Sequence, residues 1–469
     1  MIRLLNAYFP RRTLILGISE WCLIALSFIT AAVVRLGTYD ATVMLHYEQG
    51  FLKILALSGA FIVCMYYFDL YDTSVLSNQR EILSRLVQVL GTMCIGVAVL
   101  YYLYPPLELG RGIVAIGLLI VLFILAVWRV LFFALNRRSQ FAERTVIFGD
   151  GPSASRLSQE LDSRPELGLR VVGRISVARN GNYELNCEKS PVSTTCTITC
   201  DLATAIGQQR VTRIIVALDD RRGRLPVELL LSMKSRGVRI QDGTEFYEQV
   251  TGKIPIETLR LGTLLFSSGF HLSRPHLIYK RFASIMVSIV GLILTLPLLP
   301  FIALAIKLNS PGKLFYHQKR VGKDDIVFYC HKFRTMCPDA EADTGPAWAG
   351  DDDPRITPVG RFLRVTRLDE IPQLWNVLKG DMSLVGPRPE RPEFIDWLKQ
   401  EIPFYNLRHT VRPGITGWAQ IRYKYGNSVE DAKEKLRYDL FYVKNMSPGL
   451  DVLIFFETVK TILLGRGGR

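Results

Sequence analysis

The sequence predicts a membrane protein of mixed α and α/β class. Its expected order is four transmembrane helices, a Rossmann-like α/β domain, a re-entrant membrane helix and a C-terminal α+β domain. Hydrophobic residues make up 49% of the 469 residues, and the mean hydropathy of +0.20 is high for a soluble protein. These residues gather in long runs. Between the runs, a glycine turn joins a strand pattern to a helix pattern, and the last long run contains two prolines.

Four apolar segments lie within residues 1–138, and each is close to the ~20 residues that a helix needs to cross a bilayer. The segments are 14–34, 51–68, 86–104 and 113–135. Arginines precede the first segment, separate the second from the third and follow the fourth, whereas the other two loops are poor in positive charge. By the positive-inside rule, the N-terminus and the chain after Leu135 should lie in the cytoplasm. Glu20, inside the first segment, either has a function or lies near the cytoplasmic helix end.

Residues 139–255 alternate strand and helix patterns, which predicts a parallel α/β sheet. In TVIFGDGPSASRLSQELD, Gly149 and Gly151 begin a possible dinucleotide fingerprint, with Ala154 at its third position. The second strand, LRVVGRIS, runs into Val177 and has no acid at its end to bind a ribose. We therefore expect a non-catalytic structural or regulatory domain, with a working NAD site as the alternative.

The fifth apolar run, residues 281–307, follows a linker at 256–280. Pro297 and Pro300 lie inside this run, where each removes a helix hydrogen bond and favours a kink. Lysines and arginines flank both ends, which argues that both ends face the cytoplasm. We interpret the run as a re-entrant hairpin. The alternative is a fifth ordinary span, which would put residues 308–469 outside the cell.

The charge balance narrows the possible partners. The formal net charge is +14 and the sequence pI is about 9.4, which suits nucleic acid, anionic lipid or phosphorylated substrates. No nucleic-acid motif is present, so with membrane spans we expect the lipid bilayer and phosphate compounds as partners and no nucleic acid. Asp351, Asp352 and Asp353 are interpreted as a solvated loop. The scattered histidines are not expected to bind zinc, and these are His317, His331 and His409.

The eight cysteines show no paired metal spacing and imply no disulfide framework in a cytoplasmic part. We interpret several of them as incidental free thiols, namely Cys187, Cys196, Cys200, Cys330 and Cys337.

The segment RLDEIPQLWNVLKGDMSLVGPRPERPEF places two acids, Asp369 and Glu370, before a short helix expected to begin at Pro372 and to stop at Gly380. Carboxylates at a helix N-terminus should stay ionised, and such a pair can share Mg²⁺. Arginines suited to phosphate oxygens surround the pair in sequence, and these are Arg361, Arg364, Arg367, Arg388 and Arg391. Carboxylates, a metal and arginines together indicate phosphoryl transfer.

Residues from about 280 to the C-terminus resemble the bacterial sugar transferase family, the monotopic polyprenyl-phosphate phosphoglycosyl transferases. The resemblance is carried by the kinked apolar run, YCHKFRTM (329–336), DDPRITPVGRFLRVTRLDEIPQLWNVLKGDMSLVGPRPERP (352–392) and VRPGITGWAQ (411–420). The four spans and the α/β domain resemble the N-terminal part of the large members. Among these, the chain is most similar to the exopolysaccharide-initiating transferases associated with the exosortase (PEP-CTERM) sorting system.

The resemblance implies transfer of a sugar 1-phosphate from a nucleotide sugar, a UDP-sugar, to undecaprenyl phosphate with release of UMP. This is the first membrane step of exopolysaccharide repeat-unit synthesis. Asp369 matches the family's nucleophile and Glu370 its acidic partner, and both are expected to bind Mg²⁺. An aspartyl-phosphosugar intermediate would give ping-pong kinetics. The expected location is the bacterial inner membrane with residues 308–469 in the cytoplasm, and the N-terminal domains could supply a homodimer contact.

Further positions carry over from the family's motifs as phosphate- or substrate-binding residues, namely Lys332, Arg334, Arg364, Arg388 and Arg412. Each could instead be a solvated or structural side chain, and Arg412 is the weakest match. Pro387 and Pro389 should hold Arg388 in a rigid turn. Pro297 matches the family's helix-breaking proline, although Leu296 stands where the smaller transferases often carry serine.

Three other functions compete with this interpretation. A non-catalytic membrane assembly or regulatory subunit of a polysaccharide synthesis complex is the first, but the intact acid pair argues against it. A transporter is the second, although the four spans lack clear paired charges or repeats. A nicotinamide-dependent enzyme using the Gly149 turn is the third, and the missing ribose acid counts against it.

Overall fold

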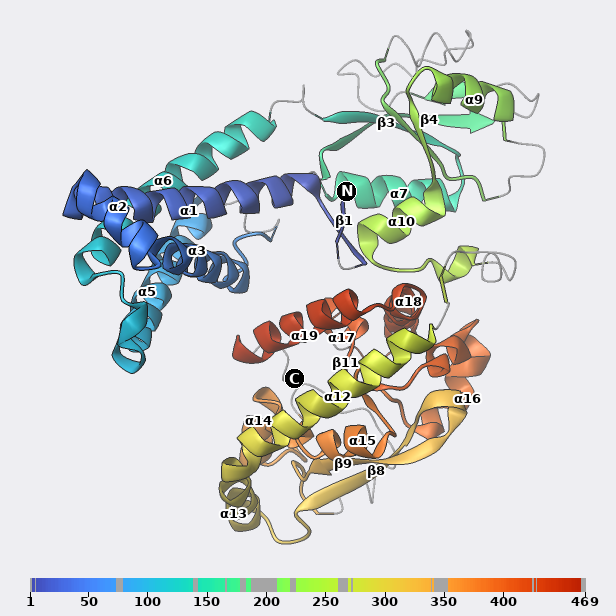
Figure 1. Cartoon of the computed structure of the whole chain (residues 1–469). Coiled ribbons are helices and arrows are strands. Elements are labelled where there is room, and N and C mark those ends of the chain that lie inside the picture. Colours follow the sequence, from blue (N-terminus) through green and yellow to red (C-terminus); the bar gives the residue numbers. More distant parts are fainter. Residues whose placement is uncertain are drawn as a thin grey trace. The chain divides into compact units, whose positions relative to one another are not determined.

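The computed structural model describes residues 2–4, 6–72, 79–137, 142–164, 167–177, 183–186, 209–219, 225–259, 269–270, 273–338, 340, 353–423, 426 and 428–464. The chain forms two compact units (Figure 1). The first is mainly Phe9–Gly243, and the second is Thr244–Arg469 together with the short N-terminal segment Arg3–Tyr8. Two short paired strands overlap that segment, namely β1 (Ile2–Leu4) and β2 (Ala7–Phe9).

The first unit begins with a bundle of apolar helices. Its helices are α1 (Arg11–Leu36), α2 (Thr38–Tyr47), α3 (Gly50–Tyr67), α5 (Gln79–Leu103), the 3₁₀ turn η1 (Pro105–Leu107) and α6 (Arg111–Arg137). Within the described residues, α1, α3, α5, α6 and the later segment Arg274–Asn309 are long and apolar enough to cross a membrane. The predicted apolar, helical N-terminus is therefore confirmed.

The bundle packs around α1, which contacts α6 along much of its length. Phe28 of α1 and Phe61 of α3 are completely buried, and their ring centroids lie 6.0 Å apart. Gly117 of α6 permits this close packing, because an added Cβ would lie 2.5 Å from the Phe28 ring. Apolar side chains on the other helix faces are exposed, as expected of surfaces that contact lipid, for example Ile95 at 69% and Phe123 at 71%.

A buried ion pair joins α1 to α6 inside the bundle. Arg129 donates from Nε to Glu20 Oε1 at 2.6 Å and from Nη2 to Glu20 Oε2 at 3.1 Å. Its Nη1 also donates to the carbonyl of Leu70 at 3.0 Å, so the chain just after α3 is held by the same guanidinium group. Glu20 is thus a paired structural carboxylate in the bundle interior.

The rest of the first unit is a five-stranded sheet in the order β5-β4-β3-β6-β7. Its strands are β3 (Glu143–Phe148), β4 (Leu169–Val177), β5 (Tyr183–Asn186), β6 (Arg213–Val216) and β7 (Arg239–Asp242). All neighbours are parallel except β4 and β5. Helices α7 (Pro152–Asp162) and α9 (Val227–Ser235) connect them, and Phe148, Ile214 and Met233 share the core. This arrangement confirms the predicted Rossmann-like domain.

The second unit combines helices with two small sheets. It opens with α10 (Gly243–Thr251), η4 (Ile256–Thr258), α12 (Arg274–Thr295), η5 (Leu296–Leu298) and α13 (Leu299–Asn309). The antiparallel hairpin that follows is β8 (Phe315–Val321), η6 (Lys323–Asp325) and β9 (Val327–Phe333). Next come α14 (Pro358–Val365), η7 (Leu368–Glu370), α15 (Gln373–Lys379), β10 (Ser383–Val385) and α16 (Pro392–Glu401).

The unit ends with η8 (Tyr405–Thr410), β11 (Gly414–Thr416), α17 (Trp418–Arg422), α18 (Val429–Asn445) and α19 (Pro448–Leu463). Strands β10 and β11 pair in parallel, although 28 residues separate Val385 from Gly414. Together with the hairpin, this pairing confirms the predicted sheet-containing C-terminal domain.

The apolar run at 281–307 breaks where its prolines lie. Helix α12 ends at Thr295, Pro297 lies in the 3₁₀ turn η5, and Pro300 lies in the first turn of α13. Both halves contact the same unit, since α12 packs on α15 and α13 packs on α14 (Figure 1).

Breaking the buried ion pair of the helix bundle should destabilise the protein. In Glu20→Gln, the buried Arg129 guanidinium keeps no anionic partner, and we expect a loss of about 3–5 kcal/mol in unfolding free energy. Glu81→Gln is the control, because Glu81 forms a partly exposed i,i+4 pair with Arg85 and should lose less than about 1 kcal/mol. Thermal unfolding of the full chain in detergent micelles measures both, and equal midpoints would contradict the structural role of Glu20.

Candidate active site

The acid pair lies in a tight turn between two helices. Arg367 adopts a left-handed backbone with φ of 58°, which redirects the chain after α14 into the 3₁₀ turn η7. As a result Asp369 and Glu370 are both buried, at 6% and 7% exposure. Helix α15 begins directly afterwards at Gln373, one residue beyond the predicted start at Pro372, and Gly380 ends it as expected.

Three cations from separate segments converge on one oxygen of Glu370. Its Oε1 accepts from Arg388 Nη2 at 2.9 Å, from Lys332 Nζ at 3.3 Å and from Arg367 Nη1 at 3.5 Å. Burial raises the pKa of Glu370, but Arg388, Lys332 and Arg367 together lower it well below its usual range. Glu370 is therefore a permanently charged anchor for these three basic side chains.

Asp369 has a different environment from its neighbour. Burial raises the pKa of Asp369 and the charge of Glu370 raises it further, whereas Lys332, Arg367 and Arg364 lower it, and the net direction is upward. Within the described part of the chain, Oδ1 of Asp369 is buried and accepts no hydrogen bond. An unsatisfied buried carboxylate oxygen is rare and points to a ligand or a reaction partner. The pair thus combines one fixed carboxylate with one available carboxylate.

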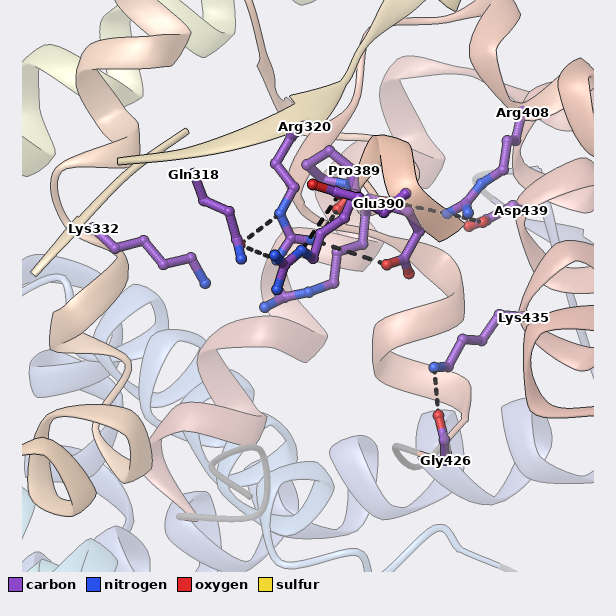
Figure 2. A network of polar contacts seen from close by, with 12 residues as sticks. Gln318, Arg320, Lys332, Pro389, Glu390, Arg408, Gly426, Lys435 and Asp439 are labelled. Atoms are coloured by element: carbon purple, nitrogen blue, oxygen red, sulfur yellow. Dashed lines mark hydrogen bonds and ion pairs between the residues drawn. The ribbon is translucent and has the colours of Figure 1, made fainter. Parts of the chain in front are cut away.

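Two buried arginines support the turn that carries Arg388. Arg408 donates from Nη2 to the carbonyl of Arg388 at 2.8 Å, and Arg320 donates from Nη1 to the carbonyl of Pro389 at 2.8 Å. Figure 2 shows this arrangement, with Arg320 between Gln318 and the turn and Arg408 facing Asp439. These hydrogen bonds hold the peptide groups on either side of Pro389, so the Arg388 side chain projects from a fixed base.

Each supporting arginine has its own anchor. Arg408 forms an ion pair with Asp439 at 2.9 Å, and both are almost fully buried, at 5% and 1% exposure. Arg320 donates from Nε to Gln318 Oε1 at 2.9 Å. Sequence reasoning missed Arg320, Arg408 and Asp439. The residues lie 68, 20 and 51 positions from Arg388, and no local pattern marks them as neighbours.

The structure brings together some of the sequence-predicted site residues. Lys332 and Arg388 contact Glu370, and Arg364 lies close enough to Asp369 to influence its pKa while donating from Nε to Thr335 Oγ1 at 3.0 Å. Arg334 and Arg412 show different contacts.

Arg334 donates to the carbonyls of Ser310 at 2.7 Å and Pro311 at 2.8 Å, which ties the exit of α13 to the end of β9. The backbone carbonyl of Arg412 lies close to Gly386, and the charge of Arg412 acts on Arg281. Neither contact involves the acid pair.

The acid pair can accommodate a magnesium ion. No group of three or more His, Cys, Asp or Glu side chains suited to a metal occurs in the described residues. Mg²⁺ needs only one or two protein carboxylates when phosphate oxygens and water complete its shell. The unsatisfied Oδ1 of Asp369 beside the charged Glu370 fits this requirement.

Other titratable groups from the sequence lie elsewhere. His317 and His331 face each other across the β8–β9 hairpin with their Nδ1 atoms 2.6 Å apart, and His409 contacts Asp325. Asp353 is buried and pairs with Arg355 at 2.6 Å, so it is not part of a solvated loop. The remaining predictions fall outside the described residues, and these concern Asp351, Asp352, Cys187, Cys196 and Cys200. Cys330 and Cys337 are free thiols.

The glycine turn of the Rossmann-like domain holds a carboxylate of the chain itself. Asp219, just after β6, accepts from Ser153 Oγ at 2.5 Å, and an added Cβ at Gly151 would lie 1.9 Å from its Oδ2. In dinucleotide-binding domains this turn and the following helix N-terminus contact the pyrophosphate. Here a negative side chain lies against the same turn, and β4 ends at Val177 without an acid.

Comparison with known proteins gives two family matches. Residues 275–465 match the family described as bacterial sugar transferase, and residues 66–240 match a family described as CoA-binding domain. The first of these confirms the resemblance predicted from the sequence motifs, and its range contains the acid pair and every predicted binding residue.

Individual relatives extend the likeness. The chain is 46% identical over 228 residues to a UDP-N-acetylgalactosamine-undecaprenyl-phosphate N-acetylgalactosaminephosphotransferase of Aeromonas hydrophila, covering 47% of this chain and 52% of that protein. It is 34% identical to a UDP-glucose:undecaprenyl-phosphate glucose-1-phosphate transferase of Klebsiella pneumoniae, covering 69% and 68%. A protein of the same description from Xanthomonas campestris pv. campestris is 29% identical over 98% of this chain and 96% of its own length. The chain thus spans about half of the first relative and nearly all of the third.

Removing the charge of Glu370 and removing the charge of Asp369 should change the unfolding free energy differently. Glu370→Gln leaves three cations without their shared anion and should cost roughly 3 kcal/mol of unfolding free energy. Asp369→Asn should be neutral or stabilising near pH 7, because a raised folded-state pKa means that the charge of Asp369 opposes folding above its unfolded pKa. Thermal and denaturant unfolding of the solubilised protein measures both changes.

A suitable control for this comparison is Glu393→Gln. Glu393 is an exposed acid whose distance to Arg391 Nε is 3.6 Å, and its loss should change stability by less than about 1 kcal/mol. If the Glu370→Gln protein were as stable as this control, the three cations would not need the Glu370 carboxylate to be stable in the folded protein.

Proposed function

Because this chain belongs to the bacterial sugar transferase family, we propose that it transfers a sugar 1-phosphate from a UDP-sugar to undecaprenyl phosphate and releases UMP. The observation that carries the proposal is the buried Oδ1 of Asp369, which accepts no hydrogen bond in the described chain and lies beside a carboxylate held by three cations. Relatives are named for N-acetylgalactosamine phosphate and glucose 1-phosphate, which supports a hexose phosphate as the transferred group.

In the first step, the Asp369 carboxylate attacks the sugar-bearing phosphorus of the donor. A bond forms between Oδ1 and phosphorus, the phosphoanhydride bond to UMP breaks, and UMP leaves with the bonding electrons. The bond between the sugar and its phosphate stays intact. Burial helps this step because it makes the carboxylate oxygen more basic, and a more basic oxygen is a better nucleophile.

In the second step, a phosphate oxygen of undecaprenyl phosphate attacks the same phosphorus. The acyl phosphate bond breaks, Asp369 regains its carboxylate, and the product is an undecaprenyl-diphosphate sugar. Two displacements on one enzyme group give ping-pong kinetics, since UMP leaves before the lipid reacts.

The cations around Glu370 neutralise the charge that gathers in both steps. Lys332, Arg367 and Arg388 are already gathered around Glu370, so a phosphate group arriving beside them meets cations that need little reorganisation. Bound Mg²⁺, held by Asp369 and Glu370, would screen the phosphate oxygens further and stabilise the leaving UMP. Glu370 itself keeps the basic side chains in position when no substrate is bound.

The placement of α13 supports a re-entrant membrane segment. Ile302 and Ile306 of α13 share a hydrophobic cluster with Leu368 and Ile371, the residues on either side of the acid pair. An opposite face of the α12–α13 segment is apolar and exposed, as in Phe282 at 62%. A straight crossing would carry α13 across the bilayer, away from the unit on which α12 packs. We therefore propose that the segment enters and leaves on the cytoplasmic side of the inner membrane, which brings the acid pair close to lipid phosphates.

The Rossmann-like domain is proposed to be non-catalytic. The Asp219 carboxylate beside Gly151 would repel a dinucleotide phosphate, and β4 supplies no acid for a ribose. Purified protein should accordingly carry no NAD, and its recovery with bound NAD would revive the alternative of a nicotinamide-dependent enzyme.

Replacing the nucleophile should abolish turnover. Purified full-length protein is given undecaprenyl phosphate, Mg²⁺ and a panel of radiolabelled UDP-hexoses, and UMP release is measured. Asp369→Asn should release no UMP because an amide cannot attack phosphorus, whereas the control Asp396→Asn, an exposed acid on α16, should behave as the parent. Chelation of Mg²⁺ should stop the parent reaction and its return should restore it.

Two outcomes of this experiment separate the parts of the proposal. Near-normal turnover in Asp369→Asn would end the nucleophile assignment. The assignment would also end if the active parent protein, incubated with donor alone, showed no sugar-phosphate mass increase on the peptide that contains Asp369. No UMP release from the parent with any donor would instead favour the non-catalytic assembly subunit.

The re-entrant topology can be tested by labelling. In a background without native cysteines, Lys313→Cys lies just after α13 and should react with a membrane-impermeant thiol reagent only after the cells are opened. Tyr47→Cys, at the last residue of α2, provides the control that should label from outside. Labelling of Lys313→Cys from outside intact cells would indicate a fifth ordinary span.

A further inference from the structure

A polar cavity lies at one end of the apolar helix bundle, remote in sequence from the acid pair. Its volume is about 710 Å³, and its lining comes from the end of α1, from α2, from the start of α3 and from the start of α6. This volume is typical of a small-molecule site. Nothing in the proposed transfer reaction uses these residues.

The cavity lining contains both signs of charge in equal number. Its basic residues are Arg35, Lys53 and Arg111, and its acidic residues are Asp40, Glu48 and Glu108. Lys53 Nζ donates to the backbone carbonyl of Glu108 at 3.3 Å, and Arg111 Nε lies 3.7 Å from Glu108 Oε1. Within the described residues, the side chains of Arg35, Asp40 and Glu48 make no hydrogen bond or ion pair. The cavity therefore offers a cation and two carboxylates that are open to a ligand.

Close backbone packing shapes the rim of the cavity. An added Cβ at Gly112 would lie 2.9 Å from Arg35 Nε, so the start of α6 passes directly along the Arg35 side chain. An added Cβ at Gly50 would lie 2.7 Å from the carbonyl of Met44, which brings the start of α3 against α2. Larger residues at Gly112 or Gly50 would force these walls apart.

Exposed tyrosines place the cavity at the depth of lipid headgroups. Tyr39 and Tyr47 of α2 are 78% and 85% exposed, and Tyr102 and Tyr104 at the end of α5 are 87% and 56% exposed. Tyrosine prefers the membrane–water interface, where its ring contacts acyl chains and its hydroxyl contacts water. These four residues belong to the same helix ends and connections as the cavity lining, so the cavity opens at that interface.

We propose that this cavity binds the headgroup of a phospholipid that carries both a phosphate and a primary ammonium, that is, a phosphoethanolamine. The phosphate would accept from Arg35 and Arg111, and the ammonium would donate to Asp40 and Glu48. Equal numbers of acids and bases favour a zwitterion over an anionic headgroup. A quaternary ammonium cannot donate hydrogen bonds and is usually bound by aromatic rings, and the cavity lining contains none.

Lipid exchange tests the proposal on the purified full-length protein. The protein is placed in nanodiscs of dioleoyl phosphatidylcholine that contain either dioleoyl phosphatidylethanolamine or dioleoyl phosphatidylglycerol, and the co-purifying lipid is measured by native mass spectrometry. We expect phosphatidylethanolamine to be enriched roughly tenfold over phosphatidylcholine, the size given by one charge-assisted hydrogen bond that choline cannot make. Equal retention of these two lipids, or stronger retention of phosphatidylglycerol, would overturn the proposal.

Variants locate the bound lipid. Asp40→Asn and Glu48→Gln, which lose the acceptors of the primary ammonium, should each remove most of the enrichment over phosphatidylcholine, whereas Arg11→Gln, at the other end of α1, should leave it unchanged. Arg35→Gln and Arg111→Gln should instead weaken the retention of both lipids, because both headgroups carry the phosphate. The Arg111 side chain is 94% exposed, so its replacement should not disturb packing. Undiminished enrichment in both Asp40→Asn and Glu48→Gln would show that the lipid binds elsewhere. The UMP-release assay is independent of this result, so failure of one proposal leaves the other standing.

Discussion

A single carboxylate oxygen organises the catalytic end of this protein. Glu370 Oε1 receives hydrogen bonds from a strand residue, Lys332, a turn residue, Arg367, and a loop residue, Arg388. Three like charges would repel one another if they had no common partner, and a buried carboxylate reverses this repulsion. The geometry of the whole site therefore depends on Glu370, although its neighbour Asp369 is the residue with an oxygen available for chemistry.

The division of roles between two adjacent acids follows from their surroundings. Both are buried to a similar extent, yet the cations lower the pKa of Glu370 while burial and the Glu370 charge raise the pKa of Asp369. Paired titratable groups whose pKa values move apart are characteristic of sites in which one group reacts and the other supports it.

Two sets of contacts hold this site in place. Behind Arg388, the buried guanidinium groups of Arg408 and Arg320 hold the carbonyls of consecutive residues, so the turn does not rely on its prolines alone. On the other side, α13 packs on Leu368 and Ile371, which flank the acid pair. The turn that carries the acid pair is thus fixed between an interior polar network and an apolar helix, which suits the proposed transfer to a membrane lipid.

The sequence alone determined the features that depend on local pattern. Hydrophobic runs located the apolar helices, and strand patterns located β3 and β4 within about two residues, because periodicity and turn residues act over short distances. The adjacent acids and the arginines around them, Arg388 included, stood out in one segment, and the resemblance to the family pointed to Lys332. The sequence could not show that Lys332 and Arg334 have different contacts, since both are basic residues in one motif. In the structure, Arg334 binds carbonyls just after α13.

Tertiary structure decided which charges meet. The partner of Glu20 lies 109 residues away, and Arg408 and Arg320 reach the Arg388 turn from separate elements. Long-range pairing of this kind has no local signature, because it depends on how whole elements pack and on the need to satisfy every buried charge. The same reason explains the Asp219 carboxylate at the Gly151 turn: the glycines are visible in the sequence, but the side chain that fills their site arrives from another strand.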